Sequence, residues 1–153
     1  NLIVKKLFSI IEDIVKYGLN PNLEIEEKKE DLEKCLVQFY ACSFNIEYIF
    51  DENDYEDFDK SIFPEIRENV RSNFPDFDFY HSILNNSKIF EKLEIGTGDA
   101  NDDLSDIIYD LLEIKWRNEN NSESDALWFF ELIFRSHTQQ HLIDLLNFMK
   151  SKN

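Results

Sequence analysis

The chain has 153 residues, of which 42% are hydrophobic and 14% aromatic. That much apolar surface excludes a disordered chain and fits a single domain, residues 1–153, with a sizeable core. Its 32 acidic and 16 basic residues give a formal net charge of -16. Such a field repels nucleic acid and anionic lipid surfaces and attracts basic proteins and divalent cations. The composition therefore predicts a basic protein as partner, with no nucleic acid and no membrane.

The scarcity of glycine and proline, three of each, favours helices over a β-sandwich or barrel. The first predicted helix starts at residue 2, and its apolar residues recur at helical spacing until Gly18 and Pro21 end the pattern. A second helix is predicted over residues 32–50, with a broad apolar face that runs to Phe50.

The middle of the chain predicts two shorter helices. Apolar residues at helical spacing indicate a third helix over residues 62–74, closed by Pro75, and a short fourth helix over residues 77–84. Residues 88–95 fit no pattern well enough to be assigned. The glycines of residues 96–98 predict a loop.

The last third of the chain predicts two long helices. The fifth begins after Asp99, where acidic residues favour a helix N-terminus, and buries apolar residues from Leu104 to Ile114. The sixth covers residues 125–149 and is capped by Ser122 or Ser124. Six helices joined by short loops predict an all-α bundle around one core.

The two cysteines, Cys35 and Cys42, fall on the same predicted helix, about 10 Å apart at 1.5 Å per residue. They cannot form a disulfide with each other. The sequence therefore predicts a reducing compartment or two buried free thiols that behave as small hydrophobic side chains. Residues 1–13 contain no signal-peptide core, which also favours the cytoplasm.

The most distinctive local feature is an acidic run, with six carboxylates in residues 51–59. Interleaved aromatic residues add apolar surface to the charge, a combination suited to binding Lys and Arg of a basic protein. The competing interpretation is a solvated loop between helices. The predicted partner-binding residues are Asp51, Asp54, Tyr55, Glu56, Asp57 and Asp59.

Two histidines four residues apart share one face of the sixth helix, a common spacing for metal ligands. Acids of the fifth helix could complete a site, which gives as alternative function a metal-dependent hydrolase with ligands Asp103, Asp106, His137 and His141. The competing interpretation is a solvated acidic face, because Asp106 and Glu113 turn away from the core on a helical wheel. The histidines would then lie at the rim of the core, bonded to a carbonyl or to an acid across the interface.

Motifs for nucleophilic or phosphate chemistry are missing from the sequence. The glycines of residues 96–98 lack the Lys-Ser/Thr of a P-loop and the third glycine of a dinucleotide fingerprint. No G-x-S-x-G occurs, and neither cysteine is close to a histidine in sequence. The sequence therefore predicts a protein without enzymatic activity and without a cofactor.

Two segments of the second half carry recognisable motifs. Residues 98–111 contain D-D-L-S-D-I-I-Y-D-L, and residues 126–141 contain A-L-W-F-F followed by F-R-S-H-T-Q-Q-H. They resemble the helices of a bacterial family, the domain of unknown function five thousand and sixty-three, with a departure at Thr138, where that family favours Trp. The resemblance implies an all-helical bacterial domain without an assigned activity. Its motif positions, of unknown role, are Asp103, Asp106, Asp110, Trp128, His137 and His141.

Small acidic helical proteins of this kind are similar to bacterial immunity proteins, which neutralise basic toxin domains by offering them an acidic surface. This hypothesis makes use of the net charge of -16, which an enzyme would leave unexplained. An immunity or inhibitor protein is thus the leading expectation. The alternatives are the metal-dependent hydrolase and a structural or scaffolding domain whose acidity serves solubility.

Overall fold

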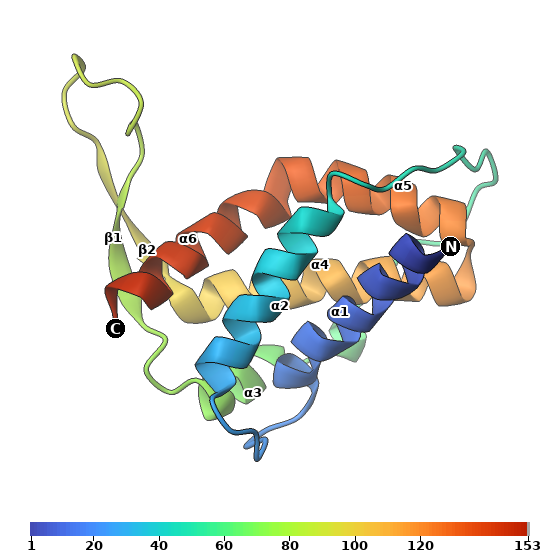
Figure 1. Ribbon diagram of the computed structural model, residues 1–153, viewed down its shortest axis with the longest axis horizontal. Coiled ribbons are helices and arrows are strands. Elements are labelled where there is room, and N and C mark those ends of the chain that lie inside the picture. Colours follow the sequence, from blue (N-terminus) through green and yellow to red (C-terminus); the bar gives the residue numbers. More distant parts are fainter. Residues whose placement is uncertain (153) are drawn as a thin grey trace.

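The computed structural model describes residues 1–152 as a predominantly helical fold with one β-hairpin (Figure 1). The elements in chain order are α1 (Leu2–Leu19), α2 (Lys28–Cys42), the 3-10 turn η1 (Lys60–Ile62), α3 (Ile66–Asn73), β1 (Phe79–Ile83), β2 (Ile95–Asp99), α4 (Ala100–Asn120), α5 (Glu123–Ile133), the π-helical turn η2 (Phe134–Thr138) and α6 (Gln139–Ser151). Because α5, η2 and α6 continue without a break, residues 1–152 form five separate α-helical runs. The prediction of six is wrong because the predicted helix over residues 77–84 contains β1 instead.

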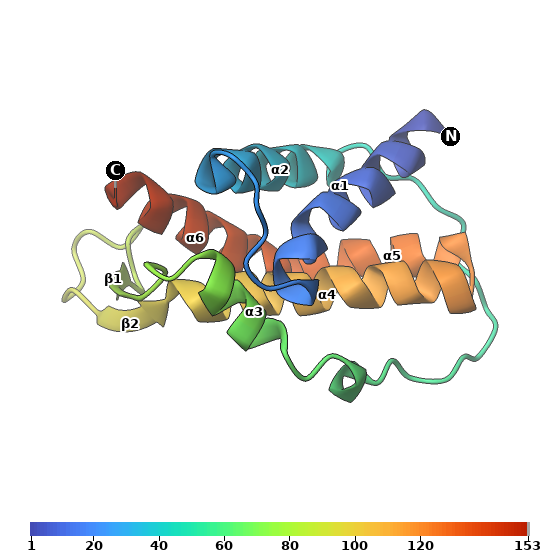
Figure 2. The ribbon, with the colours of Figure 1, turned by 90° about the horizontal axis from the view of Figure 1, so that it is seen from below.

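Helix α4 is the element on which the others pack. It contacts α1, α3, α5 and α6, and Figure 2 shows α1 and α2 on one side of it and α3 on the other. Its apolar face is buried as predicted, from Leu104 through Ile107 and Leu111 to Ile114. The buried residues of all the helices join in one hydrophobic cluster around it.

The junction between α1 and α3 shows why α1 ends where predicted. Side-chain amides of α3 cap its last carbonyl groups: Asn69 Nδ2 donates to the Gly18 oxygen at 2.7 Å, and Asn73 Nδ2 donates to the Tyr17 oxygen at 3.0 Å. These bonds satisfy acceptors that a helix C-terminus leaves free. A Cβ at Gly18 would lie 2.9 Å from Cγ2 of Ile108, so the glycine lets α1 approach α4 closely.

The second predicted helix is wrong beyond Cys42, where α2 ends. Among the apolar residues that follow, Phe44, Ile46, Tyr48 and Phe50 alternate with a period of two, and Ile49 between the last two is exposed. Two of them, Ile46 and Tyr48, pack on the core as the chain runs extended along α5. A period of two places alternate side chains on one side of an extended segment, which accounts for the loss of the helix.

The third predicted helix is divided into η1 and α3. Pro64 lies between them, and its ring disfavours the helical conformation of the residue before it and removes a backbone donor. Helix α3 therefore starts only at Ile66.

The all-α prediction is wrong between α3 and α4, where the chain forms an antiparallel hairpin. Residues predicted as a short helix form β1, and the predicted loop at residues 96–98 belongs to β2, with Tyr80 paired to Gly98 and Ile83 to Ile95. Burial along β1 alternates with a period of two, as expected for a strand with one covered face. This hairpin, residues 79–99, is named the arm.

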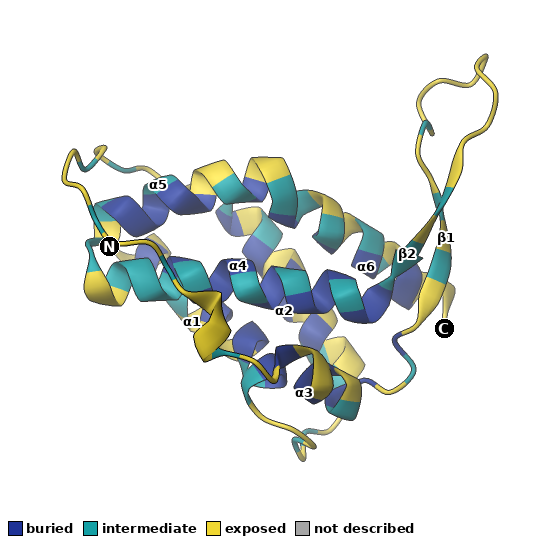
Figure 3. Ribbon diagram, turned by 180° about the vertical axis from the view of Figure 1, so that it is seen from behind, coloured by how far each residue is buried: buried dark blue, intermediate teal, exposed yellow. Residues whose placement is uncertain are grey.

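The arm extends away from the helices, and its tip is exposed on all sides (Figures 1 and 3). Its exposed large apolar side chains are Phe79, Ile83, Leu84, Ile89, Phe90, Leu93 and Ile95.

The prediction for the cysteines is confirmed, since Cys35 and Cys42 are both buried and free. Within residues 1–152, every helix is too short or too polar to cross a membrane.

Candidate functional site

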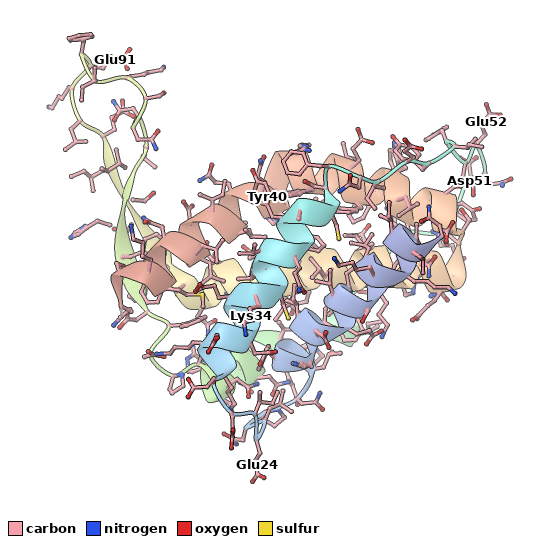
Figure 4. The ribbon with its side chains drawn as sticks, viewed as in Figure 1. Glu24, Lys34, Tyr40, Asp51, Glu52 and Glu91 are labelled. Atoms are coloured by element: carbon pink, nitrogen blue, oxygen red, sulfur yellow. The ribbon has the colours of Figure 1, made fainter. Side chains whose placement is uncertain are left out.

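The acidic run of residues 51–59, named the acidic strap, passes around the end of the molecule where α4 and α5 meet (Figure 2). Asp51 and Glu52 lie at this end, far from Glu91 at the tip of the arm (Figure 4). The strap belongs to an extended segment that connects α2 to η1.

Asp51 fixes the start of the strap. Its Oδ2 accepts hydrogen bonds from the Tyr55 hydroxyl at 2.6 Å and from the Ser122 hydroxyl at the α4–α5 turn. Its Oδ1 accepts a third bond, from the Asn53 backbone N–H at 3.0 Å. These donors, Ser122 first, hold the pKa of the Asp51 carboxyl well below its ordinary value. Further along, the ring of Phe58 lies 5.7 Å from that of Trp116, measured between centroids.

The other acids of the strap point to solvent. Each is exposed, and none forms an ion pair with another of the described residues: Glu52, Asp54, Glu56, Asp57 and Asp59. Tyr55, predicted to bind a partner, is half-buried, and its hydroxyl donates a hydrogen bond to Asp51 within the chain. The strap thus presents four carboxylates without a hydrogen-bond or ion-pair partner among the described residues, while Asp59 accepts hydrogen bonds from the Ser61 N–H and hydroxyl as the cap of η1.

A second group of titratable side chains lies between α4 and the η2–α6 segment. We name it the Asp–His cluster: Asp103, Asp106, Asp110, His137 and His141. Asp110 is buried, and its Oδ2 accepts hydrogen bonds from His137 Nδ1 and Thr138 Oγ1, both at 2.7 Å. Burial is the largest effect on this carboxyl and raises its pKa. The π-helical turn contributes both donors, since His137 and Thr138 belong to η2.

Asp103 has the same role two turns of α4 earlier. It is 4% exposed, its Oδ1 lies 2.7 Å from His141 Nδ1, and its Oδ2 accepts a hydrogen bond from the Tyr80 hydroxyl. Burial, followed by the bond to Asp103, raises the pKa of Tyr80 far above its ordinary value. Asp103 thereby connects the arm, α4 and α6.

Asp106 lies beside both histidines and is less buried than Asp103 and Asp110. Its Oδ2 is 3.4 Å from His141 Nε2, and Arg67 lies near its other oxygen. Each of Asp106, His137 and His141 has a potential ligand atom, and these three atoms lie within 4.8 Å of one another.

The cluster shows which side chains the two histidines contact. Both histidines bond to an acid across the helix interface, so the prediction of rim histidines is confirmed. The prediction of a solvated acidic face is wrong for Asp103 and Asp110, which are buried because that side of α4 faces η2 and α6. Of the four predicted metal ligands, Asp103 uses its oxygens for His141 and Tyr80.

Sequence reasoning missed Tyr80 and Thr138. Tyr80 lies 23 residues before Asp103, on a segment predicted as helix. Local spacing could therefore not predict that the two side chains are in contact. The only sequence signal at Thr138 was that the chain departs there from the pattern of the resembled family. Trp128, a motif position of that family, packs its ring 5.7 Å from the ring of Phe50 and thus holds the segment that precedes the strap.

A pocket of about 290 Å³ adjoins the cluster under the arm. Its polar lining includes Tyr80, Asp103, His141 and Asp144, and the glycines of β2 also line it. The Asp–His cluster is therefore accessible from one side.

Comparison with known proteins concerns the fold alone. No family model and no curated protein matches the chain by sequence. A crystal structure of protein BF1032 from Bacteroides fragilis is similar, with a TM-score of 0.67 and 16% sequence identity over 99% of this chain and 89% of that chain. At this identity the similarity shows that the two chains share a predominantly helical fold. Membership of the family that residues 98–111 and 126–141 resemble stays a prediction.

Proposed function

We propose that this chain is an acidic protein-binding domain that neutralises a basic bacterial toxin domain, as an immunity protein does. The observation that supports the proposal is the acidic strap, in which five exposed carboxylates form no ion pair with another of the described residues. Because the strap is fixed through Asp51 and Phe58, little conformational entropy is lost when a partner binds.

The charge distribution supports the same function through the rate of association. A net charge of -16 attracts a basic domain over long distances, and the strap carboxylates then pair with its Lys and Arg side chains. Added salt screens this attraction, since the Debye length is about 10 Å at 0.1 M ionic strength. Complex formation should therefore slow steeply as salt is raised.

The first experiment is a growth rescue. The protein encoded beside this one is expressed in bacteria with and without this chain, and growth is followed. Growth that is lost with the neighbour alone and restored by co-expression is the expected result. A neighbour that is harmless when expressed alone would contradict the proposal.

The second experiment locates the interface by neutralising three strap acids without changing their size, in the triple variant D54N/E56Q/D57N. The matched control E24Q/E26Q/E27Q makes the same charge change in a loop far from the strap (Figure 4). At low salt we expect the strap variant to reduce the association rate with the neighbouring protein by about tenfold, and the control to reduce it much less. Equal effects of the two variants would remove the strap as contact surface.

A further inference from the structure

We propose that Asp106, His137 and His141 bind one divalent transition-metal ion, held by two imidazole nitrogens and one carboxylate oxygen. Three potential ligand atoms of these residues already lie within 4.8 Å of one another. They come from two elements that pack together, α4 for Asp106 and the η2–α6 segment for the histidines. The proposal is independent of the partner-binding function.

The hydrogen bonds of the histidines favour this site. Each Nδ1 is 2.7 Å from a buried carboxylate, His137 from Asp110 and His141 from Asp103. A carboxylate only accepts, so each Nδ1 carries the hydrogen and each neutral ring keeps the lone pair on Nε2. Histidines that bind metals are oriented in this way by a carboxylate behind the ring. Two neighbouring histidines share the arrangement, and each has its own carboxylate.

The distance between His141 Nε2 and Asp106 Oδ2, 3.4 Å, fits two ligands of one ion. It is longer than an ordinary N–H···O hydrogen bond. Around a tetrahedral ion with metal–ligand bonds of 2.0–2.1 Å, two ligand atoms are about 3.4 Å apart. An ion can therefore enter between the two residues with little movement of either.

The donor set points to the class of metal. Mg²⁺ and Ca²⁺ prefer sites made of oxygen atoms, whereas imidazole nitrogen favours Zn²⁺ and its transition-metal neighbours. Three protein ligands leave a position for water, as at open zinc sites. The predicted ligand set is thereby revised, because Asp103 acts behind His141 and Asp110 takes the corresponding place behind His137.

The test uses the full chain, freed of metal with a chelator and titrated with Zn²⁺ at neutral pH by calorimetry. We expect one ion per chain with micromolar or tighter affinity. With Co²⁺ in place of Zn²⁺, we expect the visible absorption spectrum of a four-coordinate ion. The competing explanation is a protonated His141 that bridges Asp103 and Asp106 without an ion. Absence of saturable one-to-one binding would support that explanation and overturn the proposal.

Variants identify the ligands. Asp106→Asn and His137→Gln change partly exposed residues and should each weaken Zn²⁺ binding by at least about a hundredfold. Asp110→Asn alters a positioning residue, for which the expected loss is about 10- to 100-fold. The control is His81→Gln, which removes an exposed histidine of β1 and should leave the affinity unchanged.

Circular dichroism checks that each variant is folded. The two variants of partly exposed residues keep the test valid even where the buried Asp110 variant does not fold. Unchanged Zn²⁺ affinity in folded Asp106→Asn and His137→Gln would overturn the proposal, as would an equal loss in His81→Gln.

Discussion

The ring of Tyr80 lies across the backbone of Gly98, its partner in the hairpin register. A Cβ at Gly98 would be 2.1 Å from Cζ of Tyr80, a separation that no side chain tolerates. The glycine therefore leaves the space in which Tyr80 crosses β2 and donates its hydroxyl hydrogen to Asp103 on α4. This contact joins the base of the arm to the helices.

Gly98→Ala should displace the Tyr80 ring and break its hydrogen bond to Asp103. Loss of a donor to a buried carboxylate costs about 1–3 kcal/mol, so we expect the free energy of unfolding in urea to fall by about that amount. The matched control is Gly96→Ala, whose Cβ would meet only the flexible side chain of Leu84, at 3.2 Å. Equal destabilisation by the two variants would contradict this account.

Thr138→Val tests the buried hydroxyl of the π-helical turn. The side chain keeps its shape but loses the bond to Asp110, 2.7 Å long in a fully buried place, so we expect a loss of about 1–3 kcal/mol in unfolding free energy. Ser136→Ala, at an exposed position of the same turn, should change stability by less than about 0.5 kcal/mol. A neutral Thr138→Val would show that Asp110 does not depend on this donor.

Ser122→Ala removes two contacts, since the Ser122 hydroxyl bonds to Asp51 and accepts from the Asp125 N–H as the cap of α5. Loss of the cap alone costs about 0.5–2 kcal/mol. The freed strap should also be cleaved faster by a protease that cuts after acidic residues. Ser124→Ala is the control, because only Ser122 occupies the cap position. Similar cleavage rates in both variants would show that Asp51 is not the anchor.

The buried thiols give a prediction about pH. Burial is the main cause that raises the pKa of Cys35 from 9.0 to about 11, and it raises the pKa of Cys42 as well. Folded protein should therefore react slowly with a disulfide reagent at pH 8 and quickly after denaturation.

The direction of the stability change follows from the same pKa values. The unfolded chain loses the Cys35 proton near pH 9 and the folded chain only near pH 11. Unfolding is thus favoured increasingly as pH rises above about 9. The urea midpoint should be lower at pH 10 than at pH 8, and Cys35→Ala should reduce that difference. A midpoint that is equal at both pH values would contradict the predicted pKa effect.

Much of the helical core could be predicted from local pattern. Helices α1 and α4 have regular apolar spacing with clear ends, including Asp99, whose side chain caps α4 by accepting from the Asn101 and Asp102 N–H groups. The arm could not be predicted in this way. Phe79, Tyr80 and Ile83 also fit a helical spacing, and only the long-range pairing with β2 decides for a strand.

The candidate site was predictable only in part. The spacing of His137 and His141 indicated a shared face at the rim of the core, with a carbonyl group or an acid across the interface as partner. The helical wheel predicted that the acids of α4 face solvent, because a wheel describes one helix without its neighbours. In the structure, η2 and α6 cover Asp103 and Asp110. The spacing of apolar residues does not indicate the π-helical turn that brings Thr138 to Asp110.

The exposed arm has a consequence for the handling of the protein. Its tip carries Ile89 and Phe90, which are 82% and 102% exposed, and apolar tips of this kind attract one another in water. Repulsion between chains of charge -16 opposes such contacts, but it vanishes near the isoelectric point, about 4.4, and weakens in concentrated salt. The protein should therefore be least soluble near pH 4.4, and concentrated salt should also lower its solubility. The first contacts between chains should form between the tips of the arms.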